Sequence, residues 1–348
     1  MPGLWRPIVG IDAFDLKEDE IDITPWLPLL CDGNAHNFTV RIAGLTDNGN
    51  GSSVLSETVG SYWLVTGKVF VWLDEQTSHT TTGKGPYKVT PTPQFQVASS
   101  VGKTSNGTND TLTYQISAQR SLSFASTINT SSGSKRVSWQ QDLSFSNRGQ
   151  YTDQGNVQVN DQQTSGYDKS SSGYARHFEY PLHVFSAFAE IADNISIVAE
   201  VNRGKNIRTA GQPVFPTGLE SFAAAEEIHP SYSRFRGASL STAQNGNATY
   251  LANTTSSTSF SFGTTEQDMQ FSGLEIGATS SSYQFPAIAG SKELFRRHAL
   301  AVNGTIVEDS ETLIDRAIGH AHHGGTSSGR GFALSQIPGR GQRGPASA

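Results

Sequence analysis

Apolar and polar positions alternate along much of this chain, which is typical of half-buried β-strands. Every second residue is apolar in Glu20–Thr24 and in His36–Ile42, and a longer run with strand character covers Ser61–Asp74. Prolines break the apolar stretch Trp26–Leu30, which is therefore expected as neither a strand nor a long helix, and Asp32–Asn34 predicts a turn. These strands are too few to bury both faces of a sheet, so they predict part of an antiparallel sandwich.

A second series of strands, separated by turn residues, is predicted further along the chain. A spacing of about 8–15 residues between such strands favours a sandwich or a jelly roll. The expected strands are Gln94–Ala98, Thr111–Arg120, Val137–Phe145, Val157–Val159, Phe178–Phe188, Ile195–Val201, Tyr250–Phe262, Asp268–Phe271 and Leu294–Asn303.

We therefore predict an all-β fold with two antiparallel jelly-roll or β-sandwich domains, the first of them incomplete. Residues 1–85 are assigned to the first domain and residues 86–315 to the second. Residues 316–348 are rich in Gly, Ser, His and Arg and lack apolar periodicity, so they are predicted to form a disordered tail.

Composition narrows the possible partners. The formal net charge of −6 argues against nucleic acid, because phosphate binding needs a basic surface. No apolar stretch reaches the roughly 18 residues of a membrane-spanning helix. The oligomeric state is left open by the sequence.

Nine N-glycosylation sequons favour an exported glycoprotein, because chance would give only about four in a chain of this composition. The single Cys31 fits neither a disulfide framework nor a zinc site. Residues 1–7 contain no apolar segment of signal-peptide length, so a truncated gene model with a lost signal is expected. We accordingly expect a secreted, secretory or vacuolar location. The sequon asparagines are Asn37, Asn50, Asn106, Asn109, Asn129, Asn194, Asn247, Asn253 and Asn303.

Several uncommon sequence motifs in the first 74 residues resemble those of the peptide N-glycanase A family, the peptide-N4-(N-acetyl-β-glucosaminyl)asparagine amidases of plants and fungi. The motifs are Trp5–Leu16, Glu20–Leu27, Gly60–Trp63 and Gly67–Asp74, in that order. A weaker likeness continues through Tyr174–Val184 and Arg297–Asn303.

The resemblance implies two β domains whose interface shapes a glycan site. The implied reaction hydrolyses the amide between an Asn side chain and N-acetylglucosamine, giving Asp and a glycosylamine, and it needs no metal or organic cofactor. N-glycopeptides or glycoproteins would be the substrates. Family members carry a long segment before the motif that corresponds to Trp5–Ile8, so this chain is expected to be a fragment that is inactive as translated.

The implied chemistry needs a carboxylate that activates water. Asp15, Asp12 and Glu20 are the catalytic candidates, the first two because carboxylates are costly in their apolar surroundings unless they are used or hydrogen-bonded. The alternatives are that Asp15 satisfies backbone groups at a turn, that Glu20 lies on a solvated strand face, or that the main carboxylate belongs to the missing segment.

Aromatic side chains supply flat apolar faces for sugar rings, so Trp72, Trp5 and His36 are the glycan-binding candidates. Core packing is the alternative for these residues. Trp72 lies out of phase with Val71 and Leu73, which predicts that it faces away from them. Two other functional hypotheses stay open, a non-catalytic glycan-binding or cell-surface β-sandwich protein and a gene-model artefact without function.

Overall fold

The fold is described from a computed structural model of the 348-residue chain. It describes residues 19–40, 42–49, 53–59, 67–73, 80–86, 94–211, 235–277, 285–313 and 316–319. All structural statements below concern these residues.

Strands make up most of the described chain, and two short helices lie near its beginning. The helices are the 3₁₀ helix η3 (Thr24–Trp26) and α1 (Leu27–Leu30), and a further 3₁₀ turn, η4, covers Asp153–Gly155. The strands are β1 (Gly44–Asp47), β2 (Ser53–Ser56), β3 (Thr82–Lys84), β4 (Gln94–Lys103), β5 (Asn109–Thr130), β6 (Gly133–Thr152), β7 (Val157–Ser170), β8 (Ala175–Ile191), β9 (Asn194–Ala210), β10 (Gly237–Asn253), β11 (Thr258–Ile276), β12 (Ile288–Val302), β13 (Thr305–Leu313) and β14 (Arg316–Gly319).

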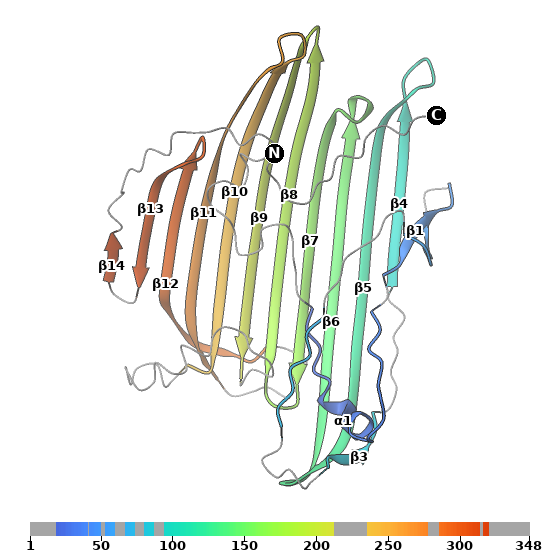
Figure 1. Ribbon diagram of the computed structural model, residues 1–348, viewed down its shortest axis with the longest axis vertical. Coiled ribbons are helices and arrows are strands. Elements are labelled where there is room, and N and C mark those ends of the chain that lie inside the picture. The colour runs from blue at the N-terminus through green and yellow to red at the C-terminus, as the bar shows by residue number, and fades with distance from the viewer. Residues whose placement is uncertain are drawn as a thin grey trace.

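Strands β3 to β14 form one 12-stranded sheet in which neighbours along the chain from β5 onward are neighbours in space (Figure 1). Each of these pairs is antiparallel, and β3 and β4 share one edge of β5, pairing with its two ends. Strands β5 to β12 have 14 to 22 residues, against a usual length of about 5–6. The separate pair β1–β2 lies beside β4 in Figure 1.

The prediction of an all-β, antiparallel fold is confirmed. Its finer part, two jelly-roll or sandwich domains, is not confirmed, because strands β5 to β14 follow a meander order within one sheet. The division at residues 85 and 86 stays a prediction. Most of the expected strands between residues 94 and 201 fall inside observed strands that extend well beyond them, since alternation weakens where Ser, Thr and Gln occupy both faces.

Three strands predicted near the N-terminus are wrong wherever the structure describes them. Residues 36–40 and 67–73 have no regular structure, and Thr46, Asp47 and Ser53 belong to the β1–β2 pair. Glu20–Thr24 is likewise no strand, since it is irregular up to the first residue of η3. Alternation marks which side chains are apolar, but a strand also needs a partner for its backbone groups, and no described strand pairs with these segments. The turn at Asp32–Asn34 is confirmed, with Asn34 N–H donating to Asp32 Oδ1 at 2.8 Å.

The predicted strand Tyr250–Phe262 is interrupted by a hairpin turn between β10 and β11. Asn253 Oδ1 closes this turn by accepting from the backbone N–H and the hydroxyl of Ser256, at 2.8 and 2.9 Å. The predicted tail also begins later than expected, because Arg316–Gly319 form β14 against β13. Its remainder, 320–348, lies outside the described residues.

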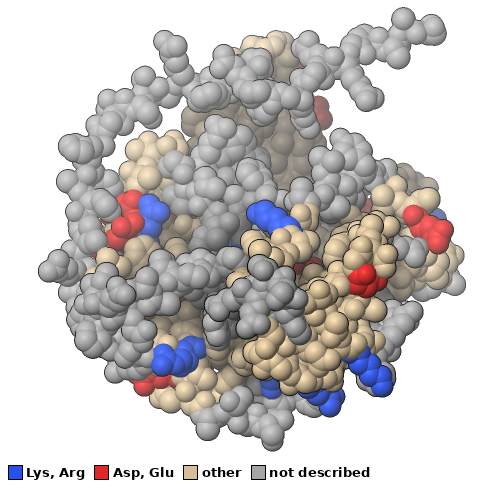
Figure 2. All heavy atoms as spheres, turned by 60° about the horizontal axis from the view of Figure 1, so that its bottom comes forward, with Lys and Arg blue, Asp and Glu red and all other residues tan. Residues whose placement is uncertain are grey.

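Buried residues gather on one face of the sheet in several small clusters. The one nearest the N-terminal helices contains Phe124, Trp139 and Tyr174, and η3 packs against β5 and β6 beside it. No described helix is long and apolar enough to cross a membrane. On the end of the molecule shown in Figure 2, basic and acidic side chains of the described residues are scattered, and no broad basic patch is visible among them.

Candidate functional site

Four of the residues predicted from the sequence lie outside the described residues. They are Asp12, Asp15, Trp5 and Asn50. Their roles stay predictions, and the site is built from the remaining candidates and from what surrounds them.

Glu20, the third catalytic candidate, lies against the sheet just before η3. Its carboxylate forms an ion pair with Arg176 of β8 through Oε2, and its side chain retains 24% exposure. Its backbone carbonyl accepts a hydrogen bond of 3.1 Å from Gln141 Nε2 on β6. Glu20 is therefore held by its backbone and its side chain together, which differs from the solvated strand face considered as its alternative.

Arg176 also binds Asp168, which lies directly opposite it on β7. Its Nε and one terminal nitrogen both donate to Asp168 Oδ2, at 2.9 and 2.7 Å. The guanidinium thus contacts two carboxylates at once, and it lies 4.7 Å from the centre of the Phe178 ring two residues further along β8. A planar guanidinium is suited to this arrangement, since its donors point outward in a fixed fork.

Gln141 completes a row of buried polar residues that runs straight across three strands. It is the cross-strand partner of Asp168, as Asp168 is of Arg176. Gln141 Nε2 donates to Asp168 Oδ1 at 3.0 Å, and Arg120 of β5 donates to Gln141 Oε1 at 2.7 Å. Gln141 and Asp168 are essentially inaccessible to solvent. The side-chain polar atoms of Gln141 and Asp168 therefore each have a partner, as burial requires.

A second tether fixes the same N-terminal segment to the sheet. Asp22 accepts a hydrogen bond from the Ser170 hydroxyl through Oδ2 at 3.0 Å, and its Oδ1 accepts from the backbone N–H of Thr24 at 2.9 Å. The second bond fixes the entry into η3, so the turn and its docking onto β7 depend on one side chain.

In this site, burial favours the neutral forms of the ionisable side chains, whereas neighbouring charges favour the charged forms. Burial raises the pKa of Asp168, even though Arg176 and the hydrogen bond from Gln141 favour the carboxylate. Burial also works against the charge of Arg176, but Asp168 and Glu20 together outweigh it, so the pKa of Arg176 is raised. The guanidinium therefore stays charged, whereas Asp168 holds a proton more readily than an exposed Asp.

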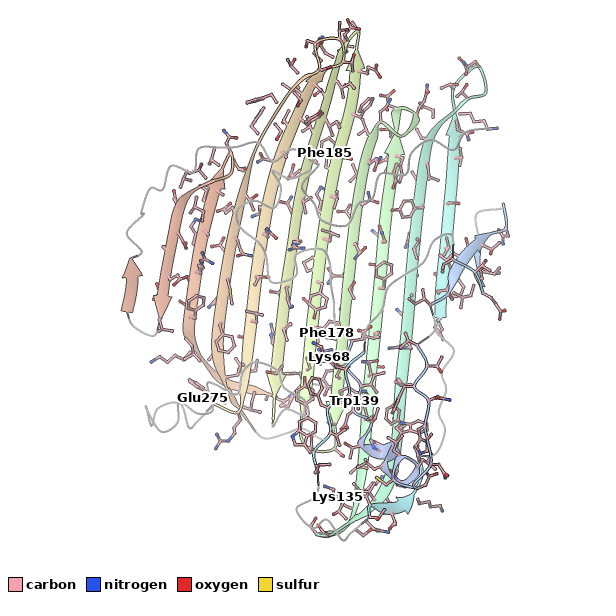
Figure 3. The ribbon with its side chains drawn as sticks, in the orientation of Figure 1. Lys68, Lys135, Trp139, Phe178, Phe185 and Glu275 are labelled. Carbon is pink, nitrogen blue, oxygen red and sulfur yellow. The ribbon has the colours of Figure 1, made fainter. Side chains whose placement is uncertain are left out.

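Aromatic rings enclose this polar row. Trp139 and Tyr174 stack with centroids 6.4 Å apart and an interplanar angle of 9°, and Trp26 meets Phe124 edge to face at 5.8 Å. Burial raises the pKa of the Tyr174 hydroxyl, which therefore stays neutral. Trp139 and Phe178 lie in the lower half of the sheet in Figure 3, the half in which Figure 1 places α1.

The two described glycan-binding candidates lie elsewhere. Trp72 is 65% exposed in the irregular segment 67–73. Val71 and Leu73 are exposed as well. His36 Nε2 lies 3.0 Å from Asp32 Oδ1 and is partly exposed. Neither residue contacts the Arg176 row, and their glycan-binding roles stay predictions.

Sequence reasoning missed Gln141, Asp168 and Arg176, although a local signal exists. Asp168 lies in a run where Gly166, Asp168 and Ser170 are buried and alternate with more exposed residues. A carboxylate at a core-facing position of a strand needs a cationic or hydrogen-bonding partner. The sequence does not show that the partner comes from the next strand, or that Glu20 joins it from far along the chain.

The fold and the site define an antiparallel β protein in which a buried arginine links a carboxylate of the sheet to one of the N-terminal segment. A protein-family model described as "Peptide N-acetyl-beta-D-glucosaminyl asparaginase amidase A" matches residues 1–90. A second family model, described as "PNGase_A C-terminal domain", matches residues 113–182. Both matched regions are thus similar to the peptide N-glycanase A family. Glu20 lies in the first matched region, whereas Gln141, Asp168 and Arg176 lie in the second, so the site joins the two.

A characterised relative is the peptide-N4-(N-acetyl-beta-glucosaminyl)asparagine amidase A of Prunus dulcis. It is 28% identical over 195 residues, which cover 54% of this chain and 30% of the relative. The chain thus aligns with under a third of the length of that relative. No solved structure matches the chain.

Proposed function

We propose that this chain carries part of a peptide N-glycanase A-type amidase, which hydrolyses the amide between an Asn side chain and N-acetylglucosamine in N-glycopeptides. The products would be an Asp in the peptide and a glycosylamine that loses ammonia. The observation that supports this proposal is the shared guanidinium of Arg176, which brings a carboxylate from each of the two family-matched regions into one site.

The proposal gives Glu20 the role of the base that activates water. An ion pair with a buried arginine fixes the direction of a carboxylate, which a positioned general base requires. Glu20 is suited to this role because part of its side chain still reaches solvent, whereas Asp168 does not. Asp12 and Asp15 remain the other candidates for the same role.

Arg176 and Asp168 act as positioning residues in this scheme. The ion pairs of Arg176 go to these two carboxylates, so it orients Glu20 instead of contacting the substrate. Asp168 holds the far side of the guanidinium, and Gln141 holds both Asp168 and the Glu20 backbone. The reaction draws on acid–base chemistry alone, so the proposal includes no cofactor.

Incubation with an N-glycopeptide at acidic pH tests the proposal. Conversion of Asn to Asp raises the peptide mass by about one unit once the glycan has left, which mass spectrometry detects. Where the unmodified chain, or the chain joined to the expected missing segment, converts the peptide, Glu20→Gln should lose conversion. Glu190→Gln, which removes an exposed carboxylate at the end of β8, should retain it. Equal conversion by both variants would remove Glu20 from the mechanism.

The second candidate is a glycan-binding protein without catalysis, which the exposed Trp72 favours. Phe70 is also exposed in the same segment, so two aromatic faces are accessible to sugar rings. Saturable binding of the glycopeptide that Trp72→Ala abolishes, with no mass change at any pH, would support this candidate over the amidase.

We also propose that the chain is glycosylated on its way through the secretory pathway. Of the eight described sequon asparagines, Asn37, Asn106, Asn109, Asn194, Asn247 and Asn303 are exposed, and the other two are half-buried. Peptide mapping of the protein produced in a secretory host would find glycans at the exposed positions. Secretion with every sequon empty would contradict this proposal.

A further inference from the structure

A second cluster of ionisable side chains lies on β11 and β12, away from the Arg176 row. Glu266, Asp268 and His298 each present one potential metal-ligand atom, and these three atoms lie within 4.8 Å of one another. The cluster is on the strands towards the β14 edge of the sheet, whereas Arg176 is on β8 (Figure 1).

The register of the sheet places these residues together. Asp268 and His298 are direct cross-strand partners, and Glu266 projects from the same face as Asp268 because it is two residues away. Leu300 lies opposite Glu266 on one side and opposite Glu308 of β13 on the other. The two carboxylates that contact His298 therefore come from the strands on either side of it, β11 and β13.

The histidine is the feature that distinguishes this cluster from an ordinary group of acidic residues. His298 Nδ1 lies 3.0 Å from Asp268 Oδ1, and Nε2 lies 3.5 Å from Glu308 Oε2. A histidine that binds a metal through one ring nitrogen usually donates from the other to a carboxylate, which fixes the ring. At His298 a carboxylate faces each nitrogen, so this arrangement is present whichever nitrogen binds.

The surrounding charge favours a cation. Three carboxylates, those of Glu266, Asp268 and Glu308, meet one imidazole. The two arginines that precede His298 on β12 are engaged by other carboxylates, Arg296 by Glu293 and Arg297 by Asp309. The carboxylates of the cluster outnumber the single imidazole that they meet.

We propose that Glu266, Asp268 and His298 bind one zinc ion, with Glu308 orienting His298. A mixed set of one imidazole and two carboxylates is a zinc ligand set, whereas calcium and magnesium prefer oxygen alone. Ligand atoms about a tetrahedral zinc are about 3.3 Å apart, so the carboxylates must move inward by about 1.5 Å at most. Rotation of the exposed Asp268 side chain permits such a movement. The ion would link β11 to β12 without taking part in amide hydrolysis.

Zinc titration of the full chain by calorimetry tests this site. We expect one zinc ion per chain, and an affinity at least tenfold lower in His298→Ala. The matched control is His183→Ala. His183 Nδ1 also lies 2.6 Å from an aspartate on the neighbouring strand, Asp161 Oδ1. Among the described residues, that is the one carboxylate that His183 pairs with. The control should bind zinc as the unmodified chain does.

A second variant and a second measurement keep the test independent of folding. Glu308→Gln leaves all three ligands in place and should lower the zinc affinity about 10–100-fold, as loss of an orienting carboxylate does. Cobalt substituted for zinc should give visible absorption bands of a tetrahedral site that are absent in His298→Ala. Absence of saturable zinc binding, equal affinity in His298→Ala, or binding of calcium in preference to zinc would each overturn the proposal.

Discussion

Arg176 and Asp168 face each other across β7 and β8, and two nitrogens of the guanidinium donate to a single carboxylate oxygen, at 2.9 and 2.7 Å. The same guanidinium reaches Glu20 in the segment that precedes η3. One side chain thus couples a cross-strand pair of the sheet to the docking of the N-terminal segment, so its effects on stability and on the proposed activity can be separated by experiment.

Replacement of Arg176 should be strongly destabilising. Arg176→Met leaves Asp168 buried without its cation, and loss of one partner of a buried ion pair costs about 3–5 kcal/mol. Urea unfolding measures the change in the free energy of unfolding. The matched control is Arg296→Met, which removes an exposed ion pair with Glu293 and should leave the unfolding midpoint unchanged. Similar midpoints for both variants would contradict the burial of the Arg176 site.

The stability of the chain should depend on pH through Asp168. Burial raises the pKa of this carboxyl above its ordinary value of 3.8, so the native state binds the proton more tightly than the unfolded state does. Stability should therefore fall, relative to Asp168→Asn, as the pH rises from about 3.8 through the raised native pKa, and then level off. Urea unfolding of both proteins across this window measures the difference. Parallel curves for the two would contradict a raised pKa.

Two tryptophans should differ sharply in their accessibility. Trp139 is fully buried against Tyr174, whereas Trp72 is 65% exposed. We expect Trp139→Phe to remove the blue-shifted emission that acrylamide does not quench, and Trp72→Phe to remove a quenchable, red-shifted component. Fluorescence quenching of the two variants compares them directly. A readily quenched Trp139 would show that the aromatic cluster is open.

Gly166 should not tolerate a side chain. A Cβ added there would overlap the ring of Phe178 on the neighbouring strand and press on Leu143. Gly166→Ala should therefore cost about 1–3 kcal/mol, whereas Gly67→Ala, which meets no atom within 4 Å, should leave stability unchanged. Thermal unfolding measures both.

The double variant Gly166→Ala with Phe178→Leu tests whether the overlap is the cause. Removal of the ring should make the alanine less costly, so the two changes together should destabilise the chain less than the sum of their separate effects. Simple additivity would mean that the cost at Gly166 arises elsewhere.

Much of the architecture could be predicted because alternation is a local property. The strands containing Leu112, Val137 and Ile195 were expected in the right places, although their ends were not, since Ser, Thr and Gln at both faces hide where a strand stops. The segments 36–40 and 67–73 show the limit of this reasoning, because no described strand pairs with them. The pairing of a strand depends on which other strand lies beside it, and a local sequence pattern does not contain that information.

The candidate site divides in the same way. The sequence by itself determined an antiparallel β protein with motifs that resemble those of the peptide N-glycanase A family, and it singled out Glu20. Only the tertiary structure decided that Glu20 meets Arg176 and that Asp168 and Gln141 stand in line with it. The physical reason is that a buried carboxylate requires a partner without specifying which one, and the register of a 12-stranded sheet makes that choice.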